Sequence, residues 1–290
     1  MRPEVTSFHD PATSTFTHVV YDEVGGNAAV IDPVLDFDPA SARTSTASAD
    51  RVLDFVQAQR LHLDWILETH AHADHLTAAA YLRRKTGAKI GIGRGITAVQ
   101  ARFQALFGIG AEFVADGRQF DRLFDEGDRF NVGGLKVRAM ATPGHTDDSL
   151  TYLIGDAAFV GDTVFAPDTG TARVDFPGGD ARKLYRSIRQ LFGLPADTRL
   201  FHCHDYPPDG REPGAQTSLD AQRRSNIHVG PHASEDSFVA MRTTRDATLP
   251  APRLMLPALQ VNIRAGELPP PDANGIRYLR LPLNQFGITE

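Results

Sequence analysis

Residues 70–75 place four potential metal ligands within six positions, in the order His70-Ala71-His72-Ala73-Asp74-His75. In an extended segment alternate side chains project from one face, so His70, His72 and Asp74 are predicted to converge. A lone histidine in a polar loop is usually only solvated. Four donors separated by small alanines instead favour a bound cation, and we predict a metal site here.

Three later segments each add a ligand where a predicted strand ends. The glycine of a Thr-Pro-Gly-His-Thr turn allows a tight backbone bend just before its histidine. The added ligands are His145 after a strand at 135–141, Asp162 after a strand at 157–160, and His204 after a strand at 199–202. Because every ligand follows a strand, we expect the strand ends to bring them to one point.

The elements that must position these ligands alternate between strands and helices. A strand at 64–68 leads into the histidine segment, and a helix at 76–86 and a strand at 88–92 follow it. Glycine-centred turns predict three hairpins, and the apolar spacing predicts three more helices. The hairpins are 15–21 with 28–32, 129–132 with 135–141, and 150–154 with 157–160; the helices are 50–60, 181–192 and 218–227, and 37–49 is expected to be a loop. Helices around two largely antiparallel β halves indicate a layered α+β sandwich.

The His-x-His-x-Asp-His motif, the Thr-Pro-Gly-His-Thr turn, the Gly-Asp pair and the late histidine together resemble the metallo-β-lactamase superfamily. The resemblance covers residues 15–227 and implies a four-layer αββα sandwich with a metal cleft at one edge of the sheets. In dinuclear members, the positions matching His70, His72 and His145 hold one metal. Those matching Asp74, His75 and His204 hold the other, and the one matching Asp162 bridges them.

Three further segments, at 170–179, 204–206 and 222–226, resemble the persulfide dioxygenases of that superfamily and the related β-lactamase-like hydrolases. This resemblance implies one Fe(II) per chain, held by His70, His145 and Asp162, the ligand set that suits iron–oxygen chemistry. The implied reaction oxidises glutathione persulfide with O2 to sulfite and glutathione. His72, Asp74, His75 and His204 would then orient the ligands or hold a second metal.

The resemblance to the dioxygenases has one departure. Members commonly have Gly-Cys-Gly-Arg-Thr-Asp-Phe where this chain has Gly-Thr-Ala-Arg-Val-Asp-Phe at 170–176. A mechanism that needs a protein thiol at that turn is therefore not expected here. The only cysteine, Cys203, is either redox-active or simply packed.

Arg173 and Tyr206 are our candidates for substrate binding. The planar guanidinium of Arg173 suits a carboxylate, although an ion pair with Asp175 or Asp180 explains it equally well. Tyr206 either faces the cleft or closes the sheet edge.

Two other functions remain open. The first is a dinuclear zinc thioesterase of the glyoxalase II type (a hydroxyacylglutathione hydrolase), with two Zn(II) per chain activating a bridging water. The second is a metal-binding protein without catalytic activity.

Composition limits the possible cellular compartment and binding partners of the protein. The chain has 290 residues, 41% of them hydrophobic and 23% charged, which is typical of a folded globular protein. One cysteine, no legible export signal and no bilayer-length apolar run favour the cytoplasm and no membrane contact. A net charge of −6 argues against nucleic acid as a partner and favours small molecules. We expect a catalytic domain at 1–230 with a Pro-rich extension at 231–290 packed on it, and a homodimer is left open.

Overall fold

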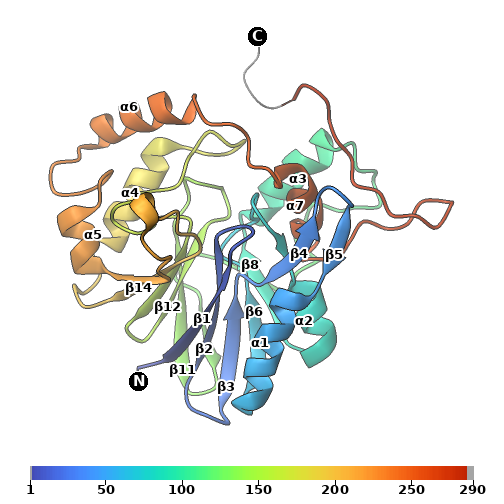
Figure 1. Cartoon of the computed structure of the whole chain (residues 1–290), viewed down its shortest axis with the longest axis horizontal. Helices are drawn as coiled ribbons and strands as arrows, with labels where there is room; N and C mark the ends of the chain where they lie inside the picture. The colour runs from blue at the N-terminus through green and yellow to red at the C-terminus, as the bar shows by residue number, and fades with distance from the viewer. Residues whose placement is uncertain (1, 286–290) are drawn as a thin grey trace.

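The computed structural model describes residues 2–285, which form two six-stranded sheets between layers of helices (Figure 1). The first sheet has the order β1-β2-β3-β6-β8-β9. Its strands are β1 (Glu4–Asp10), β2 (Thr15–Tyr21), β3 (Asn27–Ile31), β6 (His62–Leu67), β8 (Lys89–Gly93) and β9 (Arg122–Phe124). The second sheet runs in sequence order from β10 to β15. Its strands are β10 (Arg129–Val132), β11 (Leu135–Ala141), β12 (Leu150–Ile154), β13 (Ala157–Gly161), β14 (Arg199–His202) and β15 (Gln216–Ser218).

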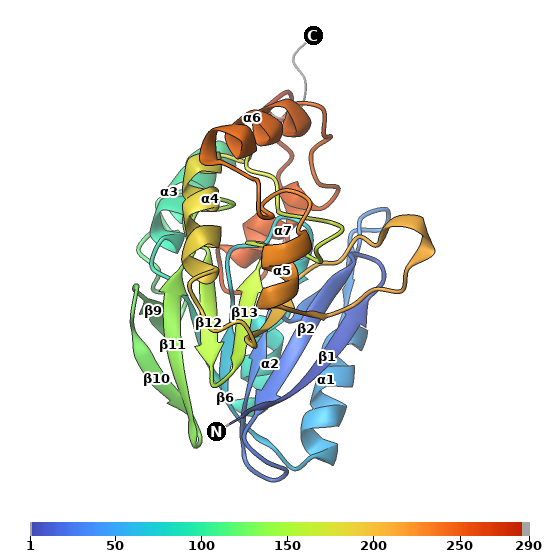
Figure 2. The ribbon, with the colours of Figure 1, turned by 90° about the vertical axis from the view of Figure 1, so that its left-hand side faces the viewer.

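Three clusters of buried side chains define four layers. Side chains of both sheets, such as Ile31 of β3 and Tyr152 of β12, share the central cluster. Helices α1 (Ala47–Ala58), α2 (Ala79–Thr86), α3 (Ile96–Leu106) and α7 (Met255–Asn262) cover the outer face of the first sheet. Helices α4 (Ala181–Leu191), α5 (Leu219–Ser225) and α6 (Glu235–Asp246) cover the second sheet (Figure 2). The expected αββα sandwich is therefore confirmed.

The first sheet is less antiparallel than the sequence suggested. Strand β3 pairs with β6, β6 with β8 and β8 with β9 in parallel. Helices α1 and α2 lie between consecutive parallel strands, and such crossovers join parallel neighbours where a hairpin cannot. The predicted hairpins of the second sheet are confirmed, because β10 pairs with β11 and β12 with β13 in antiparallel register.

Several predicted boundaries were wrong. The expected loop at 37–49 contains strand β5 (Arg43–Ser45), the last two residues of β4 (Val34–Asp38) and the start of α1 at Ala47. Both belong to a small sheet with β7 (Leu76–Thr77), so the helix expected to begin at Leu76 begins at Ala79. The helix expected at 218–227 is shorter, at 219–225, because Ser218 ends β15 and caps α5 by accepting a hydrogen bond from Ala221. Cross-strand pairing overrode the local apolar spacing in these segments.

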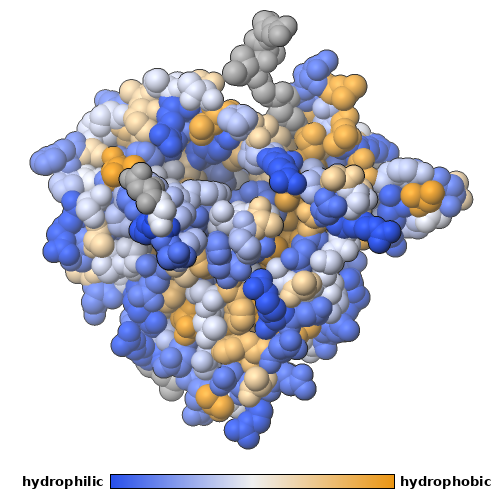
Figure 3. Space-filling view, viewed as in Figure 1, coloured by the Kyte–Doolittle hydropathy of each residue, from blue (hydrophilic) through white to orange (hydrophobic). Residues whose placement is uncertain are grey.

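The segment after residue 230 contains two helices that the sequence did not predict. Helix α7 buries Leu259 and Val261 in the cluster beneath the first sheet, so part of this segment belongs to the main core. Residues 267–285 have no helix or strand and expose apolar side chains, including Ile276, Leu281 and Leu283. Figure 3 shows apolar surface on the projecting arm at the right of the molecule, where Figure 1 places this segment. Within residues 2–285, no helix has the length and apolar character that crossing a bilayer requires.

Candidate metal centre

The predicted ligands meet at one edge of the two sheets, each just beyond the end of a strand. His70 follows β6, His145 follows β11, Asp162 directly follows β13, and His204 follows β14. This confirms the expectation that strand ends bring the ligands together.

Two glycines make the turns between these elements possible. Gly144, at φ +140°, lies so close to Leu184 of α4 that a Cβ would be 2.2 Å from the Leu184 nitrogen. Gly161, at φ +52°, lies against the Thr69 side chain in the same way. Side chains at either position would push the ligand-bearing turns apart.

His70, His145 and Asp162 form one group whose ligand atoms all lie within 4.8 Å of one another. The Nε2 atoms of His70 and His145 are 4.0 and 3.7 Å from the same Asp162 oxygen, Oδ2. All three residues are buried. His70 Nε2 and Asp162 Oδ1 have no hydrogen-bond partner among the described residues. Buried polar atoms are rarely left without a partner, so this group fits a bound cation.

Hydrogen bonds on the far side of each ring fix the two imidazoles. His145 Nδ1 donates to the backbone carbonyl of Arg173 at 2.7 Å. His70 Nδ1 lies 3.1 Å from Thr69 Oγ1, which itself donates to Asp32 Oδ2 at 2.9 Å. A ring that donates through Nδ1 presents the Nε2 lone pair, so both histidines are oriented as metal ligands.

His72 is not part of this group, although its ring centroid lies only 4.0 Å from that of His70, so the two imidazoles do lie together as predicted. The segment after β6 bends instead of continuing as a strand, and the two His72 nitrogens face Asp32 and Cys203. His72 Nε2 donates to Asp32 Oδ1 at 2.9 Å, and its Nδ1 is 4.0 Å from the sulfur of Cys203.

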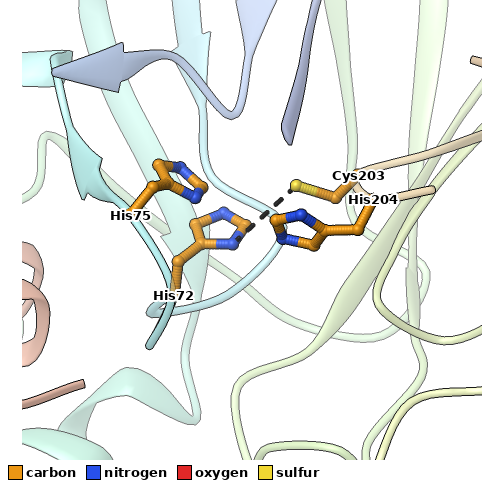
Figure 4. Close-up of side chains that lie close together, drawn as sticks. All are labelled: His72, His75, Cys203 and His204. Atoms are coloured by element: carbon orange, nitrogen blue, oxygen red, sulfur yellow. Dashed lines mark hydrogen bonds between the residues drawn. The ribbon is translucent and has the colours of Figure 1, made fainter. Parts of the chain in front are cut away.

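The remaining predicted ligands form two overlapping groups. His72, His75, Cys203 and His204 lie together and are all buried (Figure 4). Asp74, Asp162 and His204 form the other group, with His204 Nε2 in close contact with the Asp74 carboxylate. His75 is not part of that second group, although its Nδ1 lies 3.3 Å from Asp74 Oδ1.

Burial controls the electrostatics of the centre. Burial lowers the pKa of His70 well below its ordinary range, with the His72 and His145 rings adding to the effect, and burial likewise lowers the pKa of His145. Both rings are therefore neutral and able to bind a metal near pH 7. Burial raises the pKa of Asp162 to about 7, a cost that a cation beside the carboxylate would remove. Burial would lower the pKa of His204, but Asp74 and Asp162 raise it to about 10.

A cavity of about 510 Å³ opens onto this centre. His145 and Asp162 line its floor, and Phe165 and Phe176 are among its apolar walls. The volume suits a small molecule. His72, His75, Cys203 and His204 are not among the residues that line it.

Arg173 and Tyr206 both line this cavity. The guanidinium of Arg173 donates to both carboxylate oxygens of Asp175 at 2.6 Å and to the carbonyl of Pro250. The ion pair with Asp175 is thus present, and the Asp180 alternative is not, because the Asp180 side chain caps α4. The Tyr206 ring stacks on His204 with centroids 5.8 Å apart and is 48% exposed.

Four residues that support the centre were missed by the sequence analysis. Asp32 and Thr69 orient His70 and His72 as described above, and Asp148 accepts a hydrogen bond from the Ala71 backbone at 2.8 Å. Asn262 of α7 donates to the carbonyls of His72 and His75, each at 2.8 Å, and accepts from Thr77. A polar residue ending the apolar strand β3 was a signal for Asp32. Asn262, in an apolar helix far along the chain, gave none.

The fold and the ligand cluster define a metal-binding αββα protein. The sequence model of the metallo-beta-lactamase superfamily matches residues 12–204, which is about two thirds of the chain. The chain therefore belongs to the metallo-beta-lactamase superfamily, and its fold is the one that the sequence resemblance implied. Family membership and the His/Asp cluster together support a metal cofactor.

Individual relatives carry different names. A probable metallo-hydrolase of Burkholderia pseudomallei is 53% identical, over 97% of this chain and 99% of that protein. Glyoxylase B2 of Dictyostelium discoideum is 44% identical over 98% of each chain. The human mitochondrial persulfide dioxygenase ETHE1 is 27% identical, over 89% of this chain and 86% of that one. The crystal structure of ETHE1 from Myxococcus xanthus has a TM-score of 0.72 and 32% identity, covering 91% of this chain and all of that one.

Proposed function

We propose that this protein is a persulfide dioxygenase that holds one Fe(II) per chain on His70, His145 and Asp162. The observation that carries the proposal is the separate grouping of two histidines and one carboxylate, without His72, in which His145 and Asp162 line the cavity. That ligand set leaves positions open on iron and is the arrangement of non-haem Fe(II) oxygenases. The similarity to the ETHE1 proteins of Myxococcus xanthus and humans supports the same reaction class.

The proposed reaction consumes a thiol persulfide, O2 and water. In balanced form, RSSH + O2 + H2O gives RSH + SO3²⁻ + 2H⁺, with the outer sulfur oxidised, O2 reduced and the S–S bond broken. Fe(II) held by His70, His145 and Asp162 would supply the activation of O2 toward the persulfide sulfur. Glutathione persulfide is the substrate that the resemblance implies, and Arg173 and Tyr206 remain candidate contacts for it.

The chain's own residues would prepare the site before the substrate arrives. The Thr69 hydroxyl and the Arg173 carbonyl hold the two imidazoles with Nε2 toward the metal. Phe165 and Phe176 line the cavity above and limit water near the reacting sulfur. His204 Nε2 lies 3.7 Å from Asp162 Oδ1 and stabilises the carboxylate form of Asp162.

Metal analysis and oxygen uptake test this proposal in one experiment. Wild-type protein purified without added metal is compared with Asp162→Ala and with Asp54→Ala, a matched control at an exposed position of α1. We expect about one iron per chain in the wild type and the control, and none in Asp162→Ala. Oxygen consumption with glutathione persulfide, matched by sulfite release, should follow the iron. Equal rates in wild type and Asp162→Ala would rule out the iron assignment.

A dinuclear zinc thioesterase is the second candidate function. The relative named glyoxylase B2 favours it, and so does the additional group of Asp74, Asp162 and His204. About two zinc ions per chain with hydrolysis of a glutathione thioester, and no oxygen uptake, would support this candidate. A protein that binds metal but performs neither reaction would support the non-catalytic alternative.

A further inference from the structure

We propose that His72, His75, Cys203 and His204 form a second metal site, separate from the iron site, that binds one zinc ion through a cysteine thiolate and imidazoles. One ligand atom from each residue lies within 4.8 Å of the others, and all four residues are buried. Mixed cysteine and histidine ligands in this number are those of structural zinc sites. Figure 4 shows the four side chains drawn together from the loop after β6 and the end of β14.

The hydrogen bonds of His72 point its free nitrogen at the sulfur. His72 Nε2 donates to Asp32 Oδ1 at 2.9 Å, which leaves the lone pair on Nδ1. That Nδ1 is 4.0 Å from Cys203 Sγ. A carboxylate behind a histidine is the usual way in which proteins orient an imidazole toward zinc.

His75 is arranged in the same manner, whereas zinc at His204 would replace the proton that Asp74 and Asp162 favour on that ring. His75 Nδ1 lies 3.3 Å from Asp74 Oδ1, and its Nε2 is buried with no hydrogen-bond partner in the described part of the chain. His204 Nδ1 lies 3.2 Å from the Ser14 carbonyl, and its Nε2 also lacks a hydrogen-bond partner there, although it contacts the Asp74 carboxylate. The buried His75 Nε2, without a partner and grouped with a buried thiol, is difficult to explain by packing alone.

Size and charge both suit zinc. Zinc binds sulfur at about 2.3 Å and nitrogen at about 2.0–2.1 Å, so the tetrahedral ligand atoms of one thiolate and three imidazoles are roughly 3.3–3.6 Å apart. Atoms already within 4.8 Å reach that geometry with small side-chain shifts. The Cys203 thiolate would balance one positive charge, and Asp32 and Asp74, which face His72 and His75, would balance the other.

The location of the cluster indicates a structural role. None of its four residues lines the cavity at the iron site, and none belongs to the group of His70, His145 and Asp162. Structural zinc sites are closed in this way, whereas catalytic sites keep an open position. Zinc here would link the loop after β6, in the first sheet, to the end of β14, in the second.

X-ray absorption at the zinc edge tests the proposal on the wild-type protein. Iron is loaded first, without oxygen, so that His70, His145 and Asp162 are occupied, and one equivalent of zinc is then added. We expect one sulfur neighbour at about 2.3 Å together with nitrogen neighbours. Zinc bound only by nitrogen and oxygen, as at Asp74, Asp162 and His204, would overturn the proposal, and so would a failure to bind zinc.

Two variants sharpen this result. Cys203→Ser should lower zinc affinity, measured by competition with a chromophoric chelator, at least roughly a hundredfold. Loss of a residue that only supports a metal ligand costs up to about a hundredfold, and loss of a ligand itself should cost no less. It should also abolish the thiolate-to-cobalt absorption of the Co(II)-substituted wild type. Equal melting temperatures of the metal-free proteins would exclude misfolding as the cause. Asp162→Ala should keep the zinc–sulfur signal while losing iron, so failure of this proposal is distinguishable from failure of the proposed dioxygenase activity.

Discussion

The two buried ligand groups of this protein lie side by side and share the loop after β6, but they differ in their access to the cavity. His145 and Asp162 line a cavity large enough for a small molecule, whereas the residues around Cys203 line none of it. Both groups contain histidines whose far nitrogens are fixed by hydrogen bonds. If both proposals hold, the number of ligands does not distinguish the reaction site from the structural site. The feature that distinguishes them is a cavity that opens onto the ligands.

The two groups also differ in what orients them. The proposed iron ligands His70 and His145 are fixed by the Thr69 hydroxyl and by the Arg173 carbonyl. The loop that carries His72 and His75 is held from the C-terminal segment by Asn262. Variants at these supporting positions should affect one group more than the other.

The largest effect is expected for Asn262→Ala. This change leaves two buried carbonyls and one buried N–H without their partner, at a cost on the order of 3 kcal/mol in the free energy of unfolding. Zinc affinity should fall more than iron affinity, because the bonds of Asn262 reach His72 and His75 and none of the iron ligands. Denaturant unfolding and metal titration measure the two effects, and Asn131→Ala, at an exposed strand position, is the control. Equal losses of both metals would mean that Asn262 holds the whole centre.

A smaller effect is expected for Thr69→Val, which keeps the shape of the side chain but removes its hydroxyl. In contrast to Asn262→Ala, this change should affect iron binding more than zinc binding. His70 would lose the partner of its Nδ1, and iron affinity should fall roughly 10–100-fold. The zinc–sulfur signal should not change, because His72 keeps its own bond to Asp32. Thr244→Val, on the exposed face of α6, is the matched control for iron titration. Unchanged iron affinity in Thr69→Val would show that Asp32 and Thr69 do not orient His70.

The sequence predicted the ligands because each is local to a strand end. A glycine turn and a histidine or aspartate after an apolar strand are visible within a few residues, as at Gly144 and Gly161. The division of His70 and His72 between two groups was not predictable, since it depends on a bend in the loop and on Asp32, which is 40 positions from His72. Asn262 is 190 positions from His72, and only the packing of α7 against the first sheet brings it there.

The smallest effect is expected where the sequence left two roles open, at Arg173. Both Asp175 oxygens already occupy its guanidinium, so a substrate carboxylate would have to compete for the same donors. Side chains 17% and 35% exposed form a partly screened ion pair, and we expect Arg173→Gln and Asp175→Asn to cost at most about 1 kcal/mol each in stability. Iron affinity in both variants should stay within about twofold of the wild type, because His145 bonds to the backbone carbonyl of Arg173 and both substitutions keep that carbonyl. A group that orients a metal ligand would cause a larger loss. Steady-state kinetics with glutathione persulfide separate the two roles. A KM that rises only in Arg173→Gln would identify the guanidinium as a substrate contact. Equal, small changes of KM in both variants would identify the ion pair as part of the cavity wall.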